Sequence, residues 1–215
     1  MQHVAAQPPI NTLSDALFPK EALNNTLIRQ ALLVTGAVIF LALCAQVSWN
    51  IPISHAKDGS LVPVTGQTFG VLLIGALLGS RLGGISVFAY IAAGVFGAPV
   101  FADWSRWYST ISGATGGYIL GFFPMAIIVG FFAERGWDRG RWIVLPMVLA
   151  NIVLYIPGLI WLNGWLHVMS YTSGWHYTFD IGLWPFIAGD AAKLIAAALV
   201  VPAGWSLAEW RRGAP

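Results

Sequence analysis

The stretch QTFGVLLIGALLGSRLGGISVFAYIAAGVFGA, residues 67–98, decides the fold. It is apolar almost throughout and is interrupted once, near its middle, by the segment GSRLGG at 79–84. A helical residue advances about 1.5 Å and a membrane core is about 30 Å thick, so the stretch supplies two short arms. Glycines and a charge between apolar arms favour a tight turn. The stretch therefore predicts a helical hairpin in a membrane, with arms at 67–80 and 82–98.

The composition places the whole chain in the membrane class. Of its 215 residues, 57% are hydrophobic and only 9% are charged, whereas a soluble domain carries about 25% charged residues. Hydropathy adds four spans to the hairpin, at 27–48, 113–133, 142–164 and 183–205. The expected fold is all-α, a polytopic membrane protein built as a compact bundle of six transmembrane helices.

This interpretation divides the chain into three parts. Residues 1–26 are expected to form a cytoplasmic N-terminal segment, either an interfacial helix around LSDALFPKEAL or a disordered tail. They lack the layout of a signal peptide. Residues 27–205 are expected to form the six-helix transmembrane domain, and residues 206–215 a cytoplasmic tail.

Positive charges gather on one side of the predicted spans. Lys57 and Arg106 fall on the opposite side, and Lys193 falls within the membrane. The crowded side holds Lys20, Arg29, Arg81, Arg135, Arg139, Arg141, Arg211 and Arg212. Because cytoplasmic loops are enriched in Lys and Arg, both termini are expected in the cytoplasm, and the protein in the inner (cytoplasmic) membrane among its lipids. A net charge of +2 is too small to favour a nucleic-acid partner.

The segment FIAGDAAK, residues 186–193, sets a carboxylate and an ammonium in the last span. Asp190 and Lys193 are three residues apart, so they share one face of a helix. Asp190 falls roughly 10 Å below the outer surface, where an isolated charge costs at least a few kcal/mol. A mutual ion pair would neutralise both groups, but two apolar residues in their place would stabilise the fold at least as much as the pair does. The pair is therefore the leading candidate for contacting a polar small molecule.

Other polar and glycine positions fall at the same level of the bundle. The segment VPVTGQT at 62–68 opens the second span, and SGATGGY at 112–118 opens the fourth. The first supplies the neutral hydrogen-bonding residues Thr65, Gln67 and Thr68, and the second supplies Thr115, Gly116, Gly117 and Tyr118. The glycine pair permits close approach of a ligand or of another helix. Asn151 and Tyr155 share a face of the fifth span and are expected to bond between helices, and Asn151 is also a candidate for the ligand.

The absence of several motifs excludes classes of activity. The sequence holds neither the G-x-x-x-x-G-K-[ST] loop of ATPases nor the H-E-x-x-H motif of zinc proteases. The four histidines are scattered over termini and outer loops, and the single cysteine, Cys44, excludes an intrachain disulfide. We expect no enzyme, catalytic residue, metal or cofactor. A proton or ion pathway through Asp190 is the alternative, although spans one to five offer no further ionisable relay.

The first span carries a second kind of signal. Ala31 and Thr35 have the small-xxx-small spacing that lets another helix approach closely. Internal packing and the docking of a partner subunit both fit this spacing.

Several motifs together resemble the BioY family of biotin transporters. They are VPVTGQT, LLGSRLGG, GATGGY and FIAGDAAK, in this order within residues 60–205. The resemblance implies a six-helix S component of an energy-coupling factor transporter, which binds biotin near its outer face. It implies ligand contacts by Asp190 and Lys193, and a site element at Thr115 to Tyr118.

The resemblance also implies partners. Members of the family are energised by a transmembrane coupling subunit and two ATP-binding subunits, which agrees with the missing ATP loop. The same S-component fold serves other small vitamins, which are the alternative substrates. The chain departs from the family in the segment DWSRWYS at 103–109 and at Ala114. Asp103, Trp104 and Arg106 are therefore candidates only.

Overall fold

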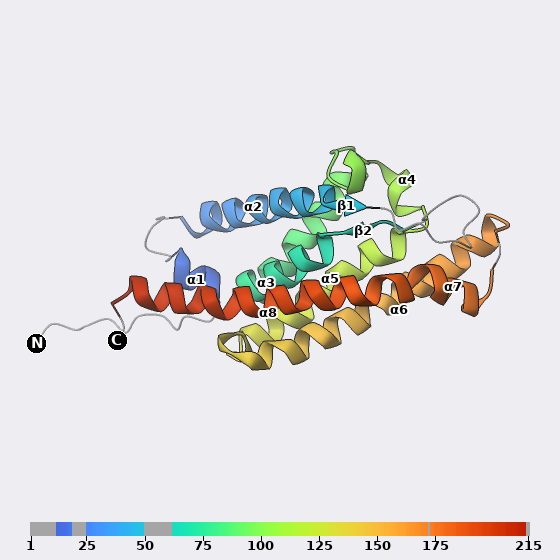
Figure 1. Cartoon of the computed structure of the whole chain (residues 1–215). Coiled ribbons are helices and arrows are strands. Elements are labelled where there is room, and N and C mark those ends of the chain that lie inside the picture. Colours follow the sequence, from blue (N-terminus) through green and yellow to red (C-terminus); the bar gives the residue numbers. More distant parts are fainter. Residues whose placement is uncertain (1–11, 19–24, 50–61, 172, 214–215) are drawn as a thin grey trace, which may run out of the picture.

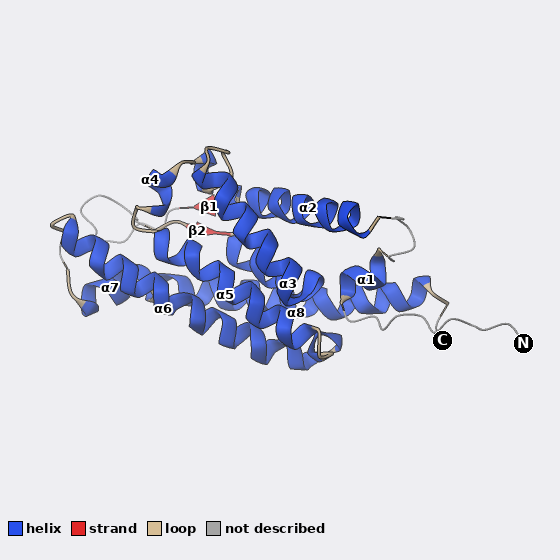
Figure 2. Ribbon diagram, turned by 180° about the vertical axis from the view of Figure 1, so that it is seen from behind, coloured by secondary structure: helices blue, strands red, loops and turns tan. Residues whose placement is uncertain are grey.

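The computed structural model describes residues 12–18, 25–49, 62–171 and 173–213. Long helices dominate it (Figures 1 and 2). In chain order the elements are α1 (Leu13–Leu17), α2 (Thr26–Gln46), β1 (Ser48–Trp49), β2 (Val64–Thr65), α3 (Gln67–Val95), η2 (Ala102–Trp104), α4 (Tyr108–Ile111), α5 (Gly116–Ala133), η3 (Trp137–Arg139), η4 (Arg141–Ile143), α6 (Val144–Val168), α7 (Trp175–Gly182) and α8 (Trp184–Arg211). The two short strands are antiparallel and pair Ser48 with Thr65 and Trp49 with Val64.

The predicted hairpin is present within α3. Gly79 has φ 80° and ψ 179°, a conformation outside the helical region that glycine adopts readily. Gln67 Nε2 donates to Tyr90 Oη at 2.8 Å across 23 residues, whereas in a straight helix these residues would lie about 35 Å apart. The chain therefore reverses at Gly79, and α3 consists of two antiparallel arms.

A carboxylate from another helix closes the α3 turn. Glu134, which follows α5, accepts the Ser80 backbone N–H at 2.7 Å and the Ser80 hydroxyl at 3.0 Å. The turn packs so closely on α5 that a Cβ at Gly130 would lie 2.3 Å from the Gly79 backbone. The start of the second arm is thus capped by an acidic group, as expected for a helix N-terminus.

The long helices run between two ends of the bundle, here called the α1 end and the α4 end (Figure 1). The α1 end holds α1, the α3 turn, η3, η4 and the last turn of α8. The α4 end holds β1, β2, η2, α4 and α7. The predicted span at 183–205 is longer than expected, because α8 continues to Arg211.

Part of the predicted N-terminal segment is folded against the bundle. Thr12 caps α1 by accepting the Asp15 N–H, and Leu13 is buried against Gly204 of α8. The Arg29 guanidinium of α2 donates to Asp15 Oδ1 at 2.9 Å and to the carbonyls of Ser14 and Phe18. The division into segments 1–26, 27–205 and 206–215 stays a prediction.

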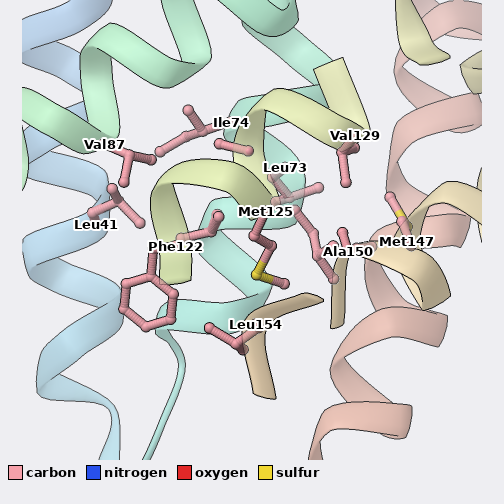
Figure 3. Packing of buried hydrophobic residues seen from close by; sticks show 14 of the residues in the cluster. Leu41, Leu73, Ile74, Val87, Phe122, Met125, Val129, Met147, Ala150 and Leu154 are labelled. Atoms are coloured by element: carbon pink, nitrogen blue, oxygen red, sulfur yellow. The ribbon is translucent and has the colours of Figure 1, made fainter. Parts of the chain in front are cut away.

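The core lies where α5 packs between α3 and α6. Figure 3 shows part of it, with Met125 and Phe122 of α5 facing Leu73 of α3 and Leu154 of α6. Within the described residues, five helical segments are long and apolar enough to cross a membrane, with η4 and α6 counted as one and α7 and α8 as another: Thr26–Gln46, Gln67–Val95, Gly116–Ala133, Arg141–Val168 and Trp175–Arg211. Large apolar side chains on the outside, such as Leu43, Ile160 and Leu199, are exposed by half or more. The chain is an all-α, multi-pass membrane protein.

Candidate functional site

The site is built around the ion pair of α8. Lys193 Nζ donates to Asp190 Oδ1 at 2.8 Å and to Thr68 Oγ1 at 3.1 Å. Thr68 Oγ1 in turn donates to Asp190 Oδ1 at 3.0 Å, which closes a triangle of hydrogen bonds between α8 and the first arm of α3. The i,i+3 spacing places both charges on one face of α8, as the sequence predicts.

Tyr155 of α6 completes the cluster. Its hydroxyl donates to Asp190 Oδ2 at 2.5 Å, so each carboxylate oxygen has a donor. Side chains of Asp190 and Lys193 are only 10% and 15% exposed. The pair carries no net charge, and charge-assisted hydrogen bonds fix the carboxylate from three elements, α3, α6 and α8.

The cluster faces a cavity of about 270 Å³. Its walls come from α3, α5, α6, α8 and the segments 62–65 and 101–115. The lining residues are Val62, Pro63, Thr65, Gln67, Thr68, Phe101, Ala102, Asp103, Ser105, Thr110, Thr115, Tyr118, Ile119, Phe122, Leu154, Tyr155, Phe186, Asp190 and Lys193. Mostly apolar walls with a few convergent polar groups are typical of a small-molecule site.

The polar groups of the cavity have unused capacity for hydrogen bonds. An ammonium has three donors, and two of those on Lys193 end on Asp190 and Thr68. The Tyr155 hydroxyl donates to Asp190 and retains acceptor lone pairs. The cluster can therefore both donate to and accept from a polar, uncharged group of a ligand.

Seven of the ten candidate residues from the sequence lie in the cavity wall. They are Thr65, Gln67, Thr68, Thr115, Tyr118, Asp190 and Lys193. Gln67 acts within the wall, because its amide accepts from Thr65 Oγ1 and donates to Tyr90 Oη. The Tyr118 hydroxyl donates to the Gly182 carbonyl at 2.8 Å and so ties α5 to the end of α7.

The other three candidates lie outside the wall. A Cβ at Gly116 would lie 1.8 Å from the Ile111 carbonyl oxygen, and one at Gly117 would lie 2.3 Å from the Pro157 carbonyl oxygen. The glycine pair therefore permits close packing of α5 on its neighbours, the alternative that the sequence left open. Asn151 Nδ2 donates to the Met147 carbonyl one turn earlier in α6.

The segment that departs from the family pattern contributes to the wall through Asp103. Trp104 and Arg106 are not lining residues. Sequence reasoning also assigned Tyr155 to bonding between helices, and gave no role to the aromatic walls Phe101, Phe122 and Phe186. In the sequence, an apolar ring carries no signal that separates a ligand wall from a packed core.

Comparisons with known proteins identify the family of the chain. The family model described as BioY family matches residues 15–209. The biotin transporter BioY of Thermotoga maritima is 32% identical over 165 residues, which cover 76% of this chain and 90% of the relative. A biotin transporter of Lactococcus lactis subsp. cremoris is 28% identical over 172 residues, covering 80% and 87% of the two chains.

A solved structure has the same fold. The crystal structure of the S-component for biotin from an ECF-type ABC transporter superposes with a TM-score of 0.71. The match covers 84% of this chain and 92% of that one, at 24% sequence identity.

Proposed function

The chain belongs to the BioY family, and from this premise we propose that it binds biotin in the cavity and carries it across the cell membrane. In this role it is the S component of an energy-coupling factor transporter rather than an enzyme. The observation that carries the proposal is the Asp190–Lys193 pair, buried, neutral as a pair and open to a cavity of about 270 Å³.

The chemistry of biotin suits this wall. Its ureido ring has two N–H donors and one carbonyl acceptor, and its bicyclic body is apolar. The Asp190 carboxylate can accept an N–H, and the ammonium of Lys193 can donate to the ureido carbonyl or to the valerate carboxylate. Phe101, Phe122 and Phe186 cover the apolar body, as is usual for small ligands.

We propose six membrane crossings, in which each arm of α3 counts as one. Both termini are then cytoplasmic, because α1 and the last turn of α8 lie at the α1 end. Arg81 follows the α3 turn, and Arg135, Arg139 and Arg141 lie between α5 and α6, so this end carries most of the positive charge. The cavity accordingly opens toward the outside, and lipid covers the exposed apolar belt.

The proposed partners are a transmembrane coupling subunit and ATP-binding subunits. Ala31 and Thr35 are exposed on α2, and a Cβ built at the neighbouring Gly36 would meet no atom within 4 Å apart from its chain neighbours and the backbone of its own helix. This small-residue face is thus not used for packing within the described part of the chain. Ala31→Leu and Thr35→Leu should weaken co-purification with the coupling subunit without changing biotin affinity. Ala196→Leu, an exposed alanine of α8, is the matched control.

Direct binding tests the central proposal. The purified chain in detergent should bind labelled biotin saturably, and unlabelled biotin should displace it whereas other vitamins should not. If a different vitamin displaces the label at a lower concentration than biotin does, the chain is an S component for that vitamin and not for biotin. A pH-driven current in liposomes without vitamin would instead support the ion pathway through Asp190.

A further inference from the structure

Gln46, the last residue of α2, binds the backbone of a distant turn through both ends of its amide. Its Nε2 donates to the Phe101 carbonyl at 3.0 Å, and its Oε1 accepts the Trp104 N–H at 3.1 Å. The two bonds bracket Ala102 and Asp103, which line the cavity. Gln46 itself does not line it. One side chain outside the cavity lining, which we call the Gln46 clasp, thus binds the backbone on both sides of two lining residues.

The turn bound by Gln46 contains backbone conformations that are uncommon for residues other than glycine. Asp103 and Trp104 have φ of 54° and 57°, in the left-handed region that is unfavourable for residues other than glycine. Trp107, three residues on, has φ 74°. Such residues persist only where surrounding contacts hold them, and they cluster at ligand-binding segments. Here the contacts on the α2 side come from Gln46.

The residues that follow α2 contact this cavity wall and a second one. Ser48 Oγ, in β1, donates to Asp103 Oδ1 of the first wall at 3.0 Å. β1 also pairs with β2, which carries the lining residue Thr65. Two cavity walls far apart in the sequence, at 62–65 and 101–105, are therefore both fastened to residues 46–49.

We propose that Gln46 is a positioning residue for ligand binding, which holds the 101–104 wall over the cavity and couples that wall to α2. Its contact with the Ala42 carbonyl at 3.1 Å is a local helix bond. The bond to the Trp104 N–H has no such local purpose. This inference rests on the proposed function for its ligand, but the state of the turn itself can be measured without biotin.

Three variants of α2 test the proposal. Gln46→Leu removes both bonds, Gln46→Glu keeps the acceptor for Trp104 and loses the donor to Phe101, and Gln30→Leu is the matched control near the other end of the helix. Hydrogen exchange of the peptide spanning 96–107 is measured without ligand, and dissociation of labelled biotin is measured by filter binding. The thermal midpoint of the ligand-free protein is measured alongside.

The expected results are graded. Gln46→Leu should speed exchange at the Trp104 amide and raise the biotin dissociation rate about tenfold, in line with the loss of two hydrogen bonds. Gln46→Glu should fall between this variant and wild type, and Gln30→Leu should match wild type. The thermal midpoint of Gln46→Leu should fall by only a few degrees, as expected for the loss of two hydrogen bonds in a chain of this length.

Other results would overturn the proposal. Unchanged exchange in Gln46→Leu would show that the clasp does not hold the turn, whether or not biotin binds. Faster exchange with an unchanged dissociation rate would show that the turn does not position the wall. Absence of biotin binding in wild type would instead refute the proposed function. The exchange result would then still show whether Gln46 holds the 101–104 turn.

Discussion

The bundle holds a buried ion pair near each end, and the two pairs differ in what surrounds them. At the α1 end Arg29 meets Asp15 at 2.9 Å, and nearer the α4 end Lys193 meets Asp190 at 2.8 Å. Arg29 also donates to the backbone carbonyls of Ser14 and Phe18. The Asp190 cluster lines a cavity and retains hydrogen-bonding capacity. Distance and burial therefore do not distinguish a structural pair from a binding pair, whereas adjoining volume does.

The largest expected effect comes from breaking the pair at the cavity. Asp190→Asn should lower biotin affinity by about a hundredfold or more, because it leaves the Lys193 ammonium buried without its counter-charge. Equilibrium binding of labelled biotin to the purified variant measures this loss. Asp180→Asn, in the more exposed pair with His176 on α7, should bind as wild type. Equal affinity of Asp190→Asn and wild type would remove Asp190 from the site.

Breaking the pair at the α1 end should act on stability instead. Arg29→Met removes three hydrogen bonds that join α2 to α1 and its flanking residue, and should lower the free energy of unfolding by about 3 kcal/mol. Biotin affinity of the folded fraction should stay within about twofold of wild type. Thermal unfolding in detergent and binding on the same preparation separate the two effects. A large loss of biotin affinity in Arg29→Met with an unchanged thermal midpoint would show that the Arg29–Asp15 pair acts in binding and not in stability.

A smaller effect sharpens the comparison inside the cavity. Tyr155→Phe removes the donor to Asp190 Oδ2 and should weaken biotin binding about tenfold, since hydrogen bonds to charged groups contribute roughly 1.5–3 kcal/mol. Tyr118→Phe is the matched variant, because that hydroxyl ends on the Gly182 carbonyl. It should change affinity less than Tyr155→Phe. If a titration with labelled biotin shows a larger loss of affinity in Tyr118→Phe than in Tyr155→Phe, the main polar contact lies at α5 and not at Tyr155.

The smallest effect concerns another buried carboxyl at the α1 end. Asp138 is fully buried and accepts Trp205 Nε1 at 2.6 Å; burial raises its pKa above the usual value, and the bond from Trp205 opposes this rise. A carboxyl whose pKa is higher in the folded state holds its proton more tightly there. Its contribution to stability is therefore largest below the unfolded pKa, about 3.9, and declines as pH rises through the folded pKa.

Asp138→Asn should remove this part of the pH dependence. The thermal midpoint of wild type should fall slightly, relative to the variant, as pH rises from the acidic range toward neutrality. Thermal unfolding at a series of pH values checks this difference. Parallel curves for the two proteins would show that Asp138 does not titrate differently in the folded and unfolded states.

The sequence predicts much of this arrangement, and it stops at the orientation of side chains between helices. The segment GSRLGG predicted the hairpin, and helical spacing predicted that Asp190 and Lys193 share a face. The same spacing places Asn151 and Tyr155 on one face, yet the Tyr155 hydroxyl reaches Asp190 while Asn151 bonds within α6. Periodicity gives the face of a helix but not the neighbour that it meets.

Two further differences have the same kind of cause. Hydropathy ended the last span at 205, because it responds to apolar residues, whereas the backbone bonds of α8 continue through the polar turn to Arg211. The glycines Gly116 and Gly117 were candidates for a ligand, but the space beside them is filled by Ile111 and Pro157. A glycine shows that something approaches closely, and only the packing shows what approaches.

The turn at Gly79 has a consequence for the opposite end of the bundle. The angle of the chain at Gly79 determines how far apart the two arms of α3 lie at their other ends. At those ends, Gln67 and Tyr90 are hydrogen-bonded to each other beside the cavity. The turn itself is fixed by its contacts with Gly130 and by the bond from Ser80 to Glu134. The distance between the two arms beside the cavity is thus set in part by residues that do not line it.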